Sequence, residues 1–437
     1  MTGRESHAFR RGAAAGRELA SAAMRPLVRA LAALRFGGDV LRATALGVRE
    51  SWRRAEVAAA PGTFGVHFLV EADPAHGLSP AARYRALQYV PLLEQAGLRC
   101  HVHPSRPGKY FTAAEPWQRR YRRWPRLAML QAHFGFWQQR RHRRADFRAA
   151  AGRGVVFLQR DLQALPGSQL EHELPLWNRH VVFDFDDAIF VRPPWSEGGA
   201  GVDAALEAKI AGICALSTSV IAANEHLAAF ARRHNGDVHV VPTTLCTDEF
   251  RPPAAAPQNA RPVVGWVGTS GNLHYLRRIG PALRRLRERC DFELRVVCNR
   301  VPREQLAGLP DDLTFVEWRQ DGEVERIQQF DVGIMPLDDD AWAVGKAAFK
   351  MVQYMACGVP FVASPVGANP ATGGPDGDCG LYADREDAWV DALAELLRDA
   401  ARRRRLGANG RARAVEQFDR RRHAPTLARI LRAAADR

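Results

Sequence analysis

Short apolar runs alternate with amphipathic helical segments along most of the chain from Phe64 onward. The first helical pattern runs from Pro80 to Gln95 and is ended by Gly97. Strands that alternate with helices predict a mostly parallel sheet covered on both faces. The strands predicted for the first half lie at Phe64 to Val70, Arg99 to His103, Val155 to Gln159, Val181 to Phe185, Val220 to Ala223 and Val238 to Val241.

A second series of the same kind follows a stretch rich in proline and alanine at 251–262, which we interpret as a linker. Helices are predicted from Leu273 to Glu288, from Lys346 to Cys357 and from about Asp387 to the end. The predicted strands lie at Val263 to Val267, Glu293 to Val297, Thr314 to Trp318, Val332 to Met335 and Pro360 to Ala363. Two doubly wound halves place a cleft between the carboxyl edges of two sheets, where ligands of open α/β sheets bind.

The length supports the same division, because 437 residues exceed what one hydrophobic core normally covers. We expect an α/β protein of two Rossmann-like domains. Its predicted parts are a basic helical extension over 1–60, an N-terminal domain over 61–250 with a basic, aromatic insert at 110–153, the linker over 251–262, a C-terminal domain over 263–415 and a last helix over 416–437.

The net charge of +14 is concentrated in two segments. Residues 1–60 contribute +6 and residues 115–154 contribute +9. The second segment interleaves its arginines with the aromatic residues Trp117, Tyr121, Trp124, Phe134, Phe136 and Trp137. Arginines and amphipathic rings together favour an anionic membrane surface as a partner. A nucleic-acid-binding surface and a merely solvated basic face stay open as alternatives.

Seven scattered cysteines, none in a Cys-x-x-Cys pair, argue against a disulfide framework and a zinc site. No stretch reaches the roughly 20 apolar residues that a spanning helix needs, and the N-terminus lacks the pattern of a secretory signal. We therefore expect a protein of the reducing cytoplasm, located peripherally at the inner face of the plasma membrane.

A glycine-rich turn follows the predicted strand that opens the second half. The apolar run leads into Gly268, Thr269, Ser270, Gly271 and Asn272, and a helix follows. Small residues let the backbone approach a phosphate while the unpaired N–H groups of the helix face it. Glycine-rich turns also commonly connect a strand to a helix without binding a ligand, so by itself this turn predicts a phosphate site only weakly.

Two lysines four residues apart, Lys346 and Lys350, lie in the predicted helix from Lys346 to Cys357. On a helix they would share a face, and their ammonium groups would repel unless an anion or water lay between them. We expect a diphosphate there. Gln353 could offer its amide to ribose hydroxyls, and the turn from Ser364 to Asn369 could face the cleft with Val366 and Gly367.

Three carboxylates follow one another at the end of a predicted strand, Asp184, Asp186 and Asp187. Such a group could hold a metal, act as nucleophile and acid, or lie solvated around a turn. Four further candidates for the cleft are Arg83 and Arg85 at the first helix, Arg160 at another strand end, and Arg300 beyond the strand from Glu293 to Val297.

Read together, these segments resemble the glycosyltransferase family 4 group, whose two-lobed fold is called GT-B. The similar stretches are SPAARYRALQYVPLLEQAGL at 79–98, VVFLQRDL at 155–162, VVFDFDDAIF at 181–190, the helix start at Asn224 and, most diagnostic, DVGIMPLDDDAWAVGKAAFKMVQYMACGVPFVASPVG at 331–367. Many members of the family place two glutamates eight residues apart where this chain has Gly345 and Gln353. We therefore assign charge neutralisation to Lys346 and Lys350.

The resemblance implies transfer of a sugar from a nucleoside diphosphate sugar to an acceptor hydroxyl, with retention of configuration and without a metal or other cofactor. It suggests a role in polysaccharide or glycolipid synthesis. Gly268, Thr269, Ser270, Asn272, Arg300, Trp318, Gln353, Val366 and Gly367 would bind the donor. Asp186 would act with the lysines, while Arg83, Arg85, Arg160, Asp184 and Asp187 would line the acceptor side, whose ligand is a saccharide or a lipid-linked acceptor.

Two other functions fit parts of the sequence. The order of Asp184 and Asp186 resembles the nucleophile loop of haloacid-dehalogenase-like phosphatases, although Ala188 stands where that family usually has threonine or valine. A basic nucleic-acid-binding protein without catalytic activity would explain the charge. We regard glycosyl transfer as the better interpretation and expect no nucleic-acid partner.

Overall fold

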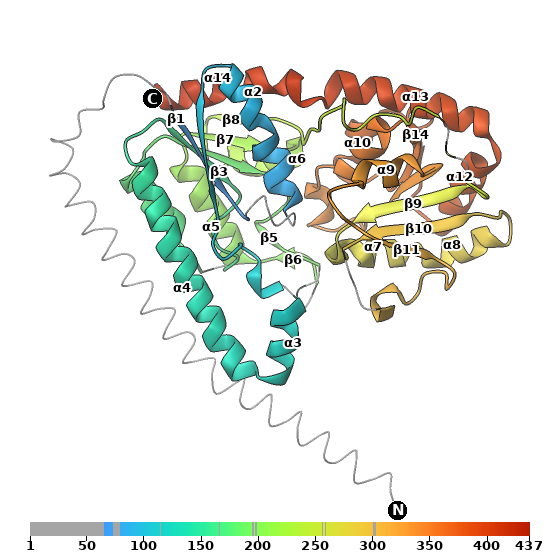
Figure 1. Cartoon of the computed structure of the whole chain (residues 1–437), viewed down its shortest axis with the longest axis horizontal. Coiled ribbons are helices and arrows are strands. Elements are labelled where there is room, and N and C mark those ends of the chain that lie inside the picture. Colours follow the sequence, from blue (N-terminus) through green and yellow to red (C-terminus); the bar gives the residue numbers. More distant parts are fainter. Residues whose placement is uncertain are drawn as a thin grey trace, which may run out of the picture.

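The computed structural model describes residues 65–72, 79–113, 115–165, 167–194, 196, 199–255, 257, 259–299 and 303–437. The predicted N-terminal extension over 1–60 lies outside these residues. Two lobes lie side by side, each built around a parallel sheet with helices on both faces (Figure 1). This is the predicted two-domain α/β architecture.

The sheet of the N-terminal lobe has six parallel strands in the order β2-β1-β3-β4-β7-β8. Its central strands are fully buried because helices cover both faces, so their residues do not alternate between apolar and polar. The strands are β1 (Gly65–Val70), β2 (Arg99–Pro104), β3 (Val155–Gln159), β4 (Val181–Phe185), β7 (Ser219–Ala222) and β8 (Val238–Val240). A small antiparallel pair, β5 (Val191–Arg192) and β6 (Gly201–Val202), lies apart from the sheet.

The helix predicted from Pro80 to Gln95 is present but irregular. A π-helical turn, η2 (Ala82–Ala86), leads through η3 (Leu87–Tyr89) into α2 (Val90–Gln95). Pro91 stands in the first turn of α2, where the missing N–H costs nothing. The break is a correction to the prediction of one continuous helix. Two regular helices, α5 (Ala204–Leu216) and α6 (Glu225–Arg232), follow later in this lobe, capped by Asp203 and Asn224.

The basic insert folds as a helical hairpin of α3 (Glu115–Arg123) and α4 (Pro125–Ala150). One face of α4 packs on the lobe through Gly135, Gln139, Arg143 and Phe147. Gly135 is required there because a Cβ would stand 2.5 Å from the Phe111 ring. The insert is thus a defined part of the lobe, preceded by η4 (Phe111–Ala113) and followed, after β3, by η5 (Leu170–Leu176).

The sheet of the C-terminal lobe has the order β11-β10-β9-β12-β13-β14. Its strands are β9 (Val263–Gly268), β10 (Glu293–Cys298), β11 (Thr314–Glu317), β12 (Val332–Met335), β13 (Phe361–Ala363) and β14 (Gly380–Tyr382). The edge strand β14 was not predicted, because three residues carry too little pattern. Its Gly380 lies where a Cβ would meet the Phe361 carbonyl at 2.5 Å.

Shorter helices surround this second sheet. The helix predicted from Leu273 to Glu288 is divided at Ile279 into α7 (Leu273–Arg278) and α8 (Gly280–Arg287), since Pro281 opens the second part. The other helical segments are η6 (Ser270–Asn272), η7 (Arg303–Leu306), α9 (Glu323–Gln328), η8 (Ala343–Gly345), α10 (Phe349–Ala356), α11 (Asn369–Gly373), α12 (Glu386–Arg398) and α13 (Ala400–Gln417).

The last helix, α14 (Arg420–Ala435), crosses back to the N-terminal lobe (Figure 1). Leu427, Ile430 and Leu431 share a buried cluster with Val66 and Phe68 of the first strand. The C-terminal end of the chain therefore completes the core of the N-terminal lobe. Among the described residues, no helix is long and apolar enough to span a membrane.

Candidate functional site

The glycine-rich turn lies at the carboxyl edge of the central strand of the second sheet. Gly268 ends β9, and η6 carries the chain into α7. The side chain of Asn299, at the end of β10, accepts a hydrogen bond from the Ser270 N–H at 2.7 Å and donates one to the Ser270 Oγ at 3.2 Å. Asn272 donates to the Thr269 Oγ1 at 3.0 Å. The turn is thereby held in a fixed shape at the edge where a ligand would bind.

Lys350 lies directly against this turn. A Cβ added to Gly268 would stand 2.6 Å from the Trp266 ring and 3.0 Å from the Lys350 Cε, so glycine lets both the ring and the lysine stem pack against the turn. The Lys350 Nζ lies 5.7 Å from the centre of the Trp266 ring. Among the described residues it has no hydrogen-bond acceptor and no ion-pair partner. Burial and the nearby Lys346 lower the pKa of Lys350 to about 7.

Lys346 reaches the same region from a loop. The prediction that both lysines share one helix face is wrong, because Lys346 follows η8 in extended conformation and α10 begins only at Phe349. The left-handed backbone of Ala348, with a φ of 53°, separates the two segments. The Lys346 Nζ nevertheless lies 5.8 Å from the centre of the Tyr275 ring on α7. The fold, and not helical spacing, brings the two ammonium groups together beside the turn.

The loop that carries Lys346 also touches the other lobe. The Nδ2 of Asn224, the N-cap of α6, donates to the Gly345 carbonyl at 3.0 Å and to the Lys346 carbonyl at 3.3 Å. A Cβ on Gly345 would stand 2.6 Å from the Cβ of Ala188. The Lys346 Nζ lies 3.9 Å from the nearest oxygen of Asp187. The lysine therefore lies between the lobes, with an aspartate opposite.

Glu323 forms a second contact between the lobes, which the sequence analysis missed. This carboxylate is 5% exposed. It accepts hydrogen bonds from Arg83 at 2.8 Å and Tyr84 at 3.0 Å in the N-terminal lobe. Within its own lobe it accepts from Trp318 at 3.2 Å and Gln353 at 2.9 Å. Three predicted site residues, Arg83, Trp318 and Gln353, thus bind the same carboxylate. Glu323 stands alone at the start of α9, outside any motif, so the sequence did not point to it.

Two of the predicted acceptor-side residues neutralise each other inside the N-terminal lobe. Arg85 donates to both oxygens of Asp184, at 3.1 and 2.5 Å, and also to the Val241 carbonyl at 2.7 Å. Asp184 is 1% exposed and Arg85 is 4% exposed. The prediction that they face the cleft is wrong, because Asp184 lies within β4 and the π-helical turn directs Arg85 to it. Neither group is free to contact a ligand.

Arg160, Asp186 and Asp187 form a second cluster, at the carboxyl ends of β3 and β4. The guanidinium donates to Asp186 at 2.7 Å and to Asp187 at 2.7 Å. Burial opposes ionisation of Asp186, but the Arg160 charge outweighs it and lowers its pKa. Arg160 has a left-handed backbone with a φ of 56°, which is uncommon for this residue type and is often found at functional sites. Asp187 faces Lys346 across the interlobe contact.

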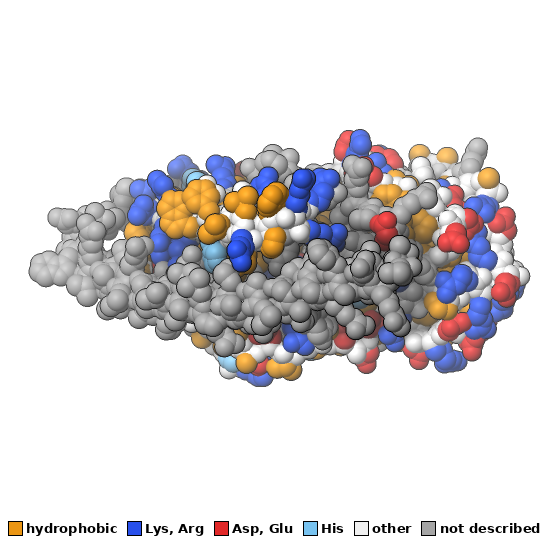
Figure 2. All heavy atoms as spheres, turned by 90° about the horizontal axis from the view of Figure 1, so that it is seen from below, with side chains coloured by type: hydrophobic (Ala, Val, Ile, Leu, Met, Phe, Trp, Pro, Cys, Tyr) orange, Lys and Arg blue, Asp and Glu red, His pale blue; other side chains and the backbone are white. Residues whose placement is uncertain are grey.

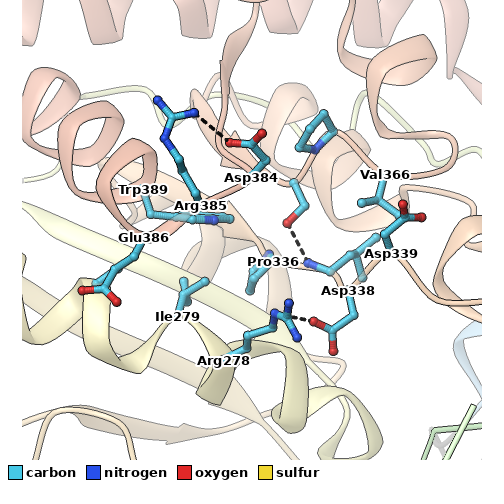
Figure 3. Close-up of a pocket in the computed structure, with 14 residues that line it drawn as sticks. Arg278, Ile279, Pro336, Asp338, Asp339, Val366, Asp384, Arg385, Glu386 and Trp389 are labelled. Atoms are coloured by element: carbon cyan, nitrogen blue, oxygen red, sulfur yellow. Dashed lines mark hydrogen bonds and ion pairs between the residues drawn. The ribbon is translucent and has the colours of Figure 1, made fainter.

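A pocket of about 370 Å³ opens at the carboxyl edges of the neighbouring strands (Figure 3). Its walls include Arg278 of α7, Asp338 after β12 and Val366 after β13; Arg278 and Asp338 are paired at 2.6 Å. The predicted residue Gly367 stands beside Val366 with a φ of 57°, where a Cβ would lie 2.6 Å from the Val344 carbonyl oxygen. The pocket wall and the loop before Lys346 are therefore packed against each other.

Arg300 lies outside the described residues, so its role in donor binding stays a prediction. Among the residues that are described, no group of three or more His, Cys, Asp or Glu side chains is arranged to hold a metal ion. The candidate site consists of the Gly268 turn with Lys350 and Lys346 in the C-terminal lobe, and of Arg160, Asp186 and Asp187 in the N-terminal lobe, where Asp187 faces Lys346.

The comparisons with known proteins bear on the family and on the fold. Residues 261–399 match the sequence model of the family described as "Glycosyl transferases group 1". Most of the C-terminal lobe is thus similar to group 1 glycosyltransferases, in agreement with the resemblance inferred from residues 331–367. MMP alpha-(1->4)-mannosyltransferase from Mycolicibacterium hassiacum is 30% identical over 212 residues, which span 46% of this chain and 50% of that relative.

Similarity to solved structures confirms the GT-B fold. Sucrose-phosphate synthase from Thermosynechococcus elongatus superposes with a TM-score of 0.65 at 17% identity, over 85% of this chain and 98% of that one. Anabaena HepE, solved in complex with UDP-glucose, gives a TM-score of 0.57 at 12% identity over 85% and 99%. A glycosyltransferase from Rickettsia africae gives 0.57 at 11% identity over 86% and 99%. At these identities the likeness establishes the fold.

Proposed function

We propose that this protein is a glycosyltransferase that moves a sugar from a nucleoside diphosphate sugar to an acceptor hydroxyl. The observation that carries the proposal is Lys350, a half-buried ammonium beside the Gly268 turn that has no anionic partner among the described residues. An unpaired cation in a partly dry site is costly unless a ligand supplies the opposite charge. A diphosphate held at the turn supplies it.

The chemistry follows from this placement. Cleavage of the bond between the anomeric carbon and the diphosphate builds negative charge on the leaving oxygens. Lys350 and Lys346 already lie beside the Gly268 turn, so they stabilise that charge without reorganisation, whereas the Ser270 N–H is engaged by Asn299. The two lysines supply the positive charge that a metal provides in other enzymes, and we propose that the reaction needs no metal or other cofactor. Donor binding would also involve Thr269, Ser270 and Asn272.

The acceptor would enter from the side of Asp186 and Asp187. Asp187 lies opposite Lys346, so an acceptor hydroxyl bound by this carboxylate lies next to the donor phosphates. Asp186 and Arg160 hold Asp187 in place through the shared guanidinium. We propose a saccharide or lipid-linked acceptor and transfer with retention of configuration. The proposed setting is polysaccharide or glycolipid synthesis at the cytoplasmic face of the plasma membrane.

The relatives support the class of donor. HepE was solved with UDP-glucose, and a mannosyltransferase shares 30% identity over part of this chain. The phosphatase alternative is not favoured, because both oxygens of Asp184 are occupied by Arg85 and neither can attack phosphorus. Trp318, Gln353 and Val366 are proposed to line the nucleoside end of the donor site.

The first test replaces Lys350 by methionine, which keeps the length of the stem beside Trp266 and removes the charge. Once a nucleotide sugar that raises the melting temperature has been found from a panel, we expect Lys350→Met to lower donor turnover by roughly 10² to 10³-fold, the usual cost of one charge-stabilising group. Far-UV circular dichroism should be unchanged.

The matched control is Arg277→Met, which removes a positive charge from the exposed part of α7 in the same lobe. This variant should retain full turnover. If Lys350→Met turns over the donor as fast as the unaltered protein, the assignment of the diphosphate to this turn is wrong.

A further inference from the structure

One face of α4 is apolar and exposed to solvent. Trp124, just before the helix, and Leu127, Leu130, Phe134 and Trp137 within it are spaced three or four residues apart and so lie in one row. Each is between 50 and 68% exposed. Phe134 and Trp137 stack with ring centres 5.6 Å apart. A continuous row of large, solvent-exposed apolar side chains is typical of a surface that binds a partner molecule or a membrane. We call it the α4 stripe.

Positive charge surrounds the α4 stripe. The chain has no aspartate or glutamate between Glu115 and Asp146. The exposed arginines of this hairpin are Arg119, Arg120, Arg122, Arg123, Arg126, Arg141 and Arg148. In Figure 2, hydrophobic and basic side chains lie together on the lower face of the N-terminal lobe, while most of the visible acidic side chains lie over the other lobe. The partner of this surface should therefore be both apolar and anionic.

We propose that the α4 stripe inserts into the surface of an anionic lipid bilayer, with the flanking arginines at the headgroups. Leucine and the aromatic rings would enter the boundary between headgroups and acyl chains, and each arginine near the surface adds electrostatic attraction. This docking surface belongs to the N-terminal lobe and uses none of the residues assigned to glycosyl transfer.

Charge decides between this partner and the others. A second copy of the chain would bring another hairpin of the same sign against this one. The extension over 1–60 carries +6, so it too would place positive charge on positive charge. Nucleic acid would pair with the arginines, but it offers no medium in which Leu127 and Leu130 are removed from water. A lipid surface satisfies both features of the stripe.

The experiment measures co-sedimentation of the full chain with vesicles of phosphatidylglycerol and phosphatidylcholine in equal amounts, and with vesicles of phosphatidylcholine alone. We expect binding to the anionic vesicles that weakens as salt is added. Leu130→Asp and Trp137→Asp should each weaken partitioning at least about tenfold, because a large apolar side chain no longer leaves water. Val202→Asp is the control, since Val202 is 76% exposed on β6 and the variant adds the same charge outside the hairpin.

Three results would overturn the proposal. One is binding of the stripe variants equal to that of the unaltered protein, with the melting temperature unchanged in all. Another is a dimer, seen by sedimentation, that the stripe variants dissociate. The last is tighter binding to a short DNA duplex than to the vesicles, lost in the same variants. Vesicle binding needs no sugar donor, so the outcome is independent of the proposed transferase activity.

Discussion

At the scale of single residues, the charged groups of the chain divide into those that satisfy each other and those left for a ligand. Arg85 and Asp184 belong to the first kind, since each is buried and bound to the other. Lys350 belongs to the second, because it is half-buried beside Gly268 and unpaired among the described residues. The sequence shows all three only as charged residues of the predicted site, and the difference between them arises from the partners that each side chain contacts in the folded protein.

The pKa of Lys350 predicts how donor binding depends on pH. Its ordinary pKa is 10.5, and burial together with Lys346 lowers it to about 7 in the free protein. A bound diphosphate favours the charged lysine and raises the pKa again, so binding above pH 7 takes up a proton. Affinity for a nucleotide sugar should then fall by up to about tenfold per pH unit from pH 7 to 9.

Calorimetric titrations in buffers of different ionisation enthalpy measure this proton uptake directly. Lys350→Met should bind more weakly and without proton uptake. Equal affinity at pH 7 and pH 9 in the unaltered protein would contradict the placement of the diphosphate beside Lys350.

The buried pair of Arg85 and Asp184 predicts an asymmetry between single and double substitutions. Asp184→Leu leaves the guanidinium buried without its partner and should lower the free energy of unfolding by about 3 to 5 kcal/mol. The double variant Arg85→Met with Asp184→Leu should recover much of this loss, because no uncompensated charge remains. Denaturant unfolding measures both values, and a double variant as unstable as the sum of the two singles would show that the pair is not coupled.

At the scale of secondary structure, the strands were predicted more closely than the helices. Buried strands of a parallel sheet give continuous apolar runs, and those at β1, β3, β4, β9, β10 and β12 were recognised within one or two residues. Helix breaks were missed at Ile279 and near Pro91, although each has a proline within the helical pattern. The start of α10 was placed too early because the helical pattern continues through Lys346, while the backbone turns left-handed at Ala348.

The helix α14 gives a prediction at this scale. Leu431 is fully buried, and it lies against the N-terminal lobe although it is among the last residues of the chain. Leu431→Ala should destabilise that lobe by about 2 to 5 kcal/mol. In thermal unfolding we expect the melting temperature to fall, while Arg429→Ala on the exposed side of the same helix should have little effect. Equal effects of the two changes would mean that α14 is not part of the core.

At the scale of the whole molecule, the lobes meet through apolar and polar contacts whose partners come from distant parts of the chain, and the Tyr84 and Phe349 rings lie 4.3 Å apart between them. Asn224 binds the carbonyls of Gly345 and Lys346, and Arg83 binds Glu323. Both contacts border the proposed donor site. Contacts between domains of one chain commonly allow relative motion, so the position of the lobes should respond to removal of these two polar contacts and to ligand binding.

Small-angle X-ray scattering tests this expectation. The double variant Arg83→Met with Asn224→Ala should have a larger radius of gyration than the unaltered protein, since two contacts between the lobes are lost. A saturating nucleotide sugar should reduce the difference by bridging the cleft. An unchanged radius in the double variant would show that other contacts hold the lobes together.

The sequence alone determined the two-lobed parallel architecture, the glycine turn at the edge of the second sheet and the pair of lysines, because apolar periodicity and local motifs are written in neighbouring residues. Only the tertiary structure decided which charged side chains form ion pairs with each other and which remain available to a ligand. Glu323 is an example, because it accepts hydrogen bonds from Arg83 and Tyr84, which lie 240 and 239 residues away in the sequence. Pairing across such separations depends on how the strands and lobes are assembled, so no local pattern of residues predicts it.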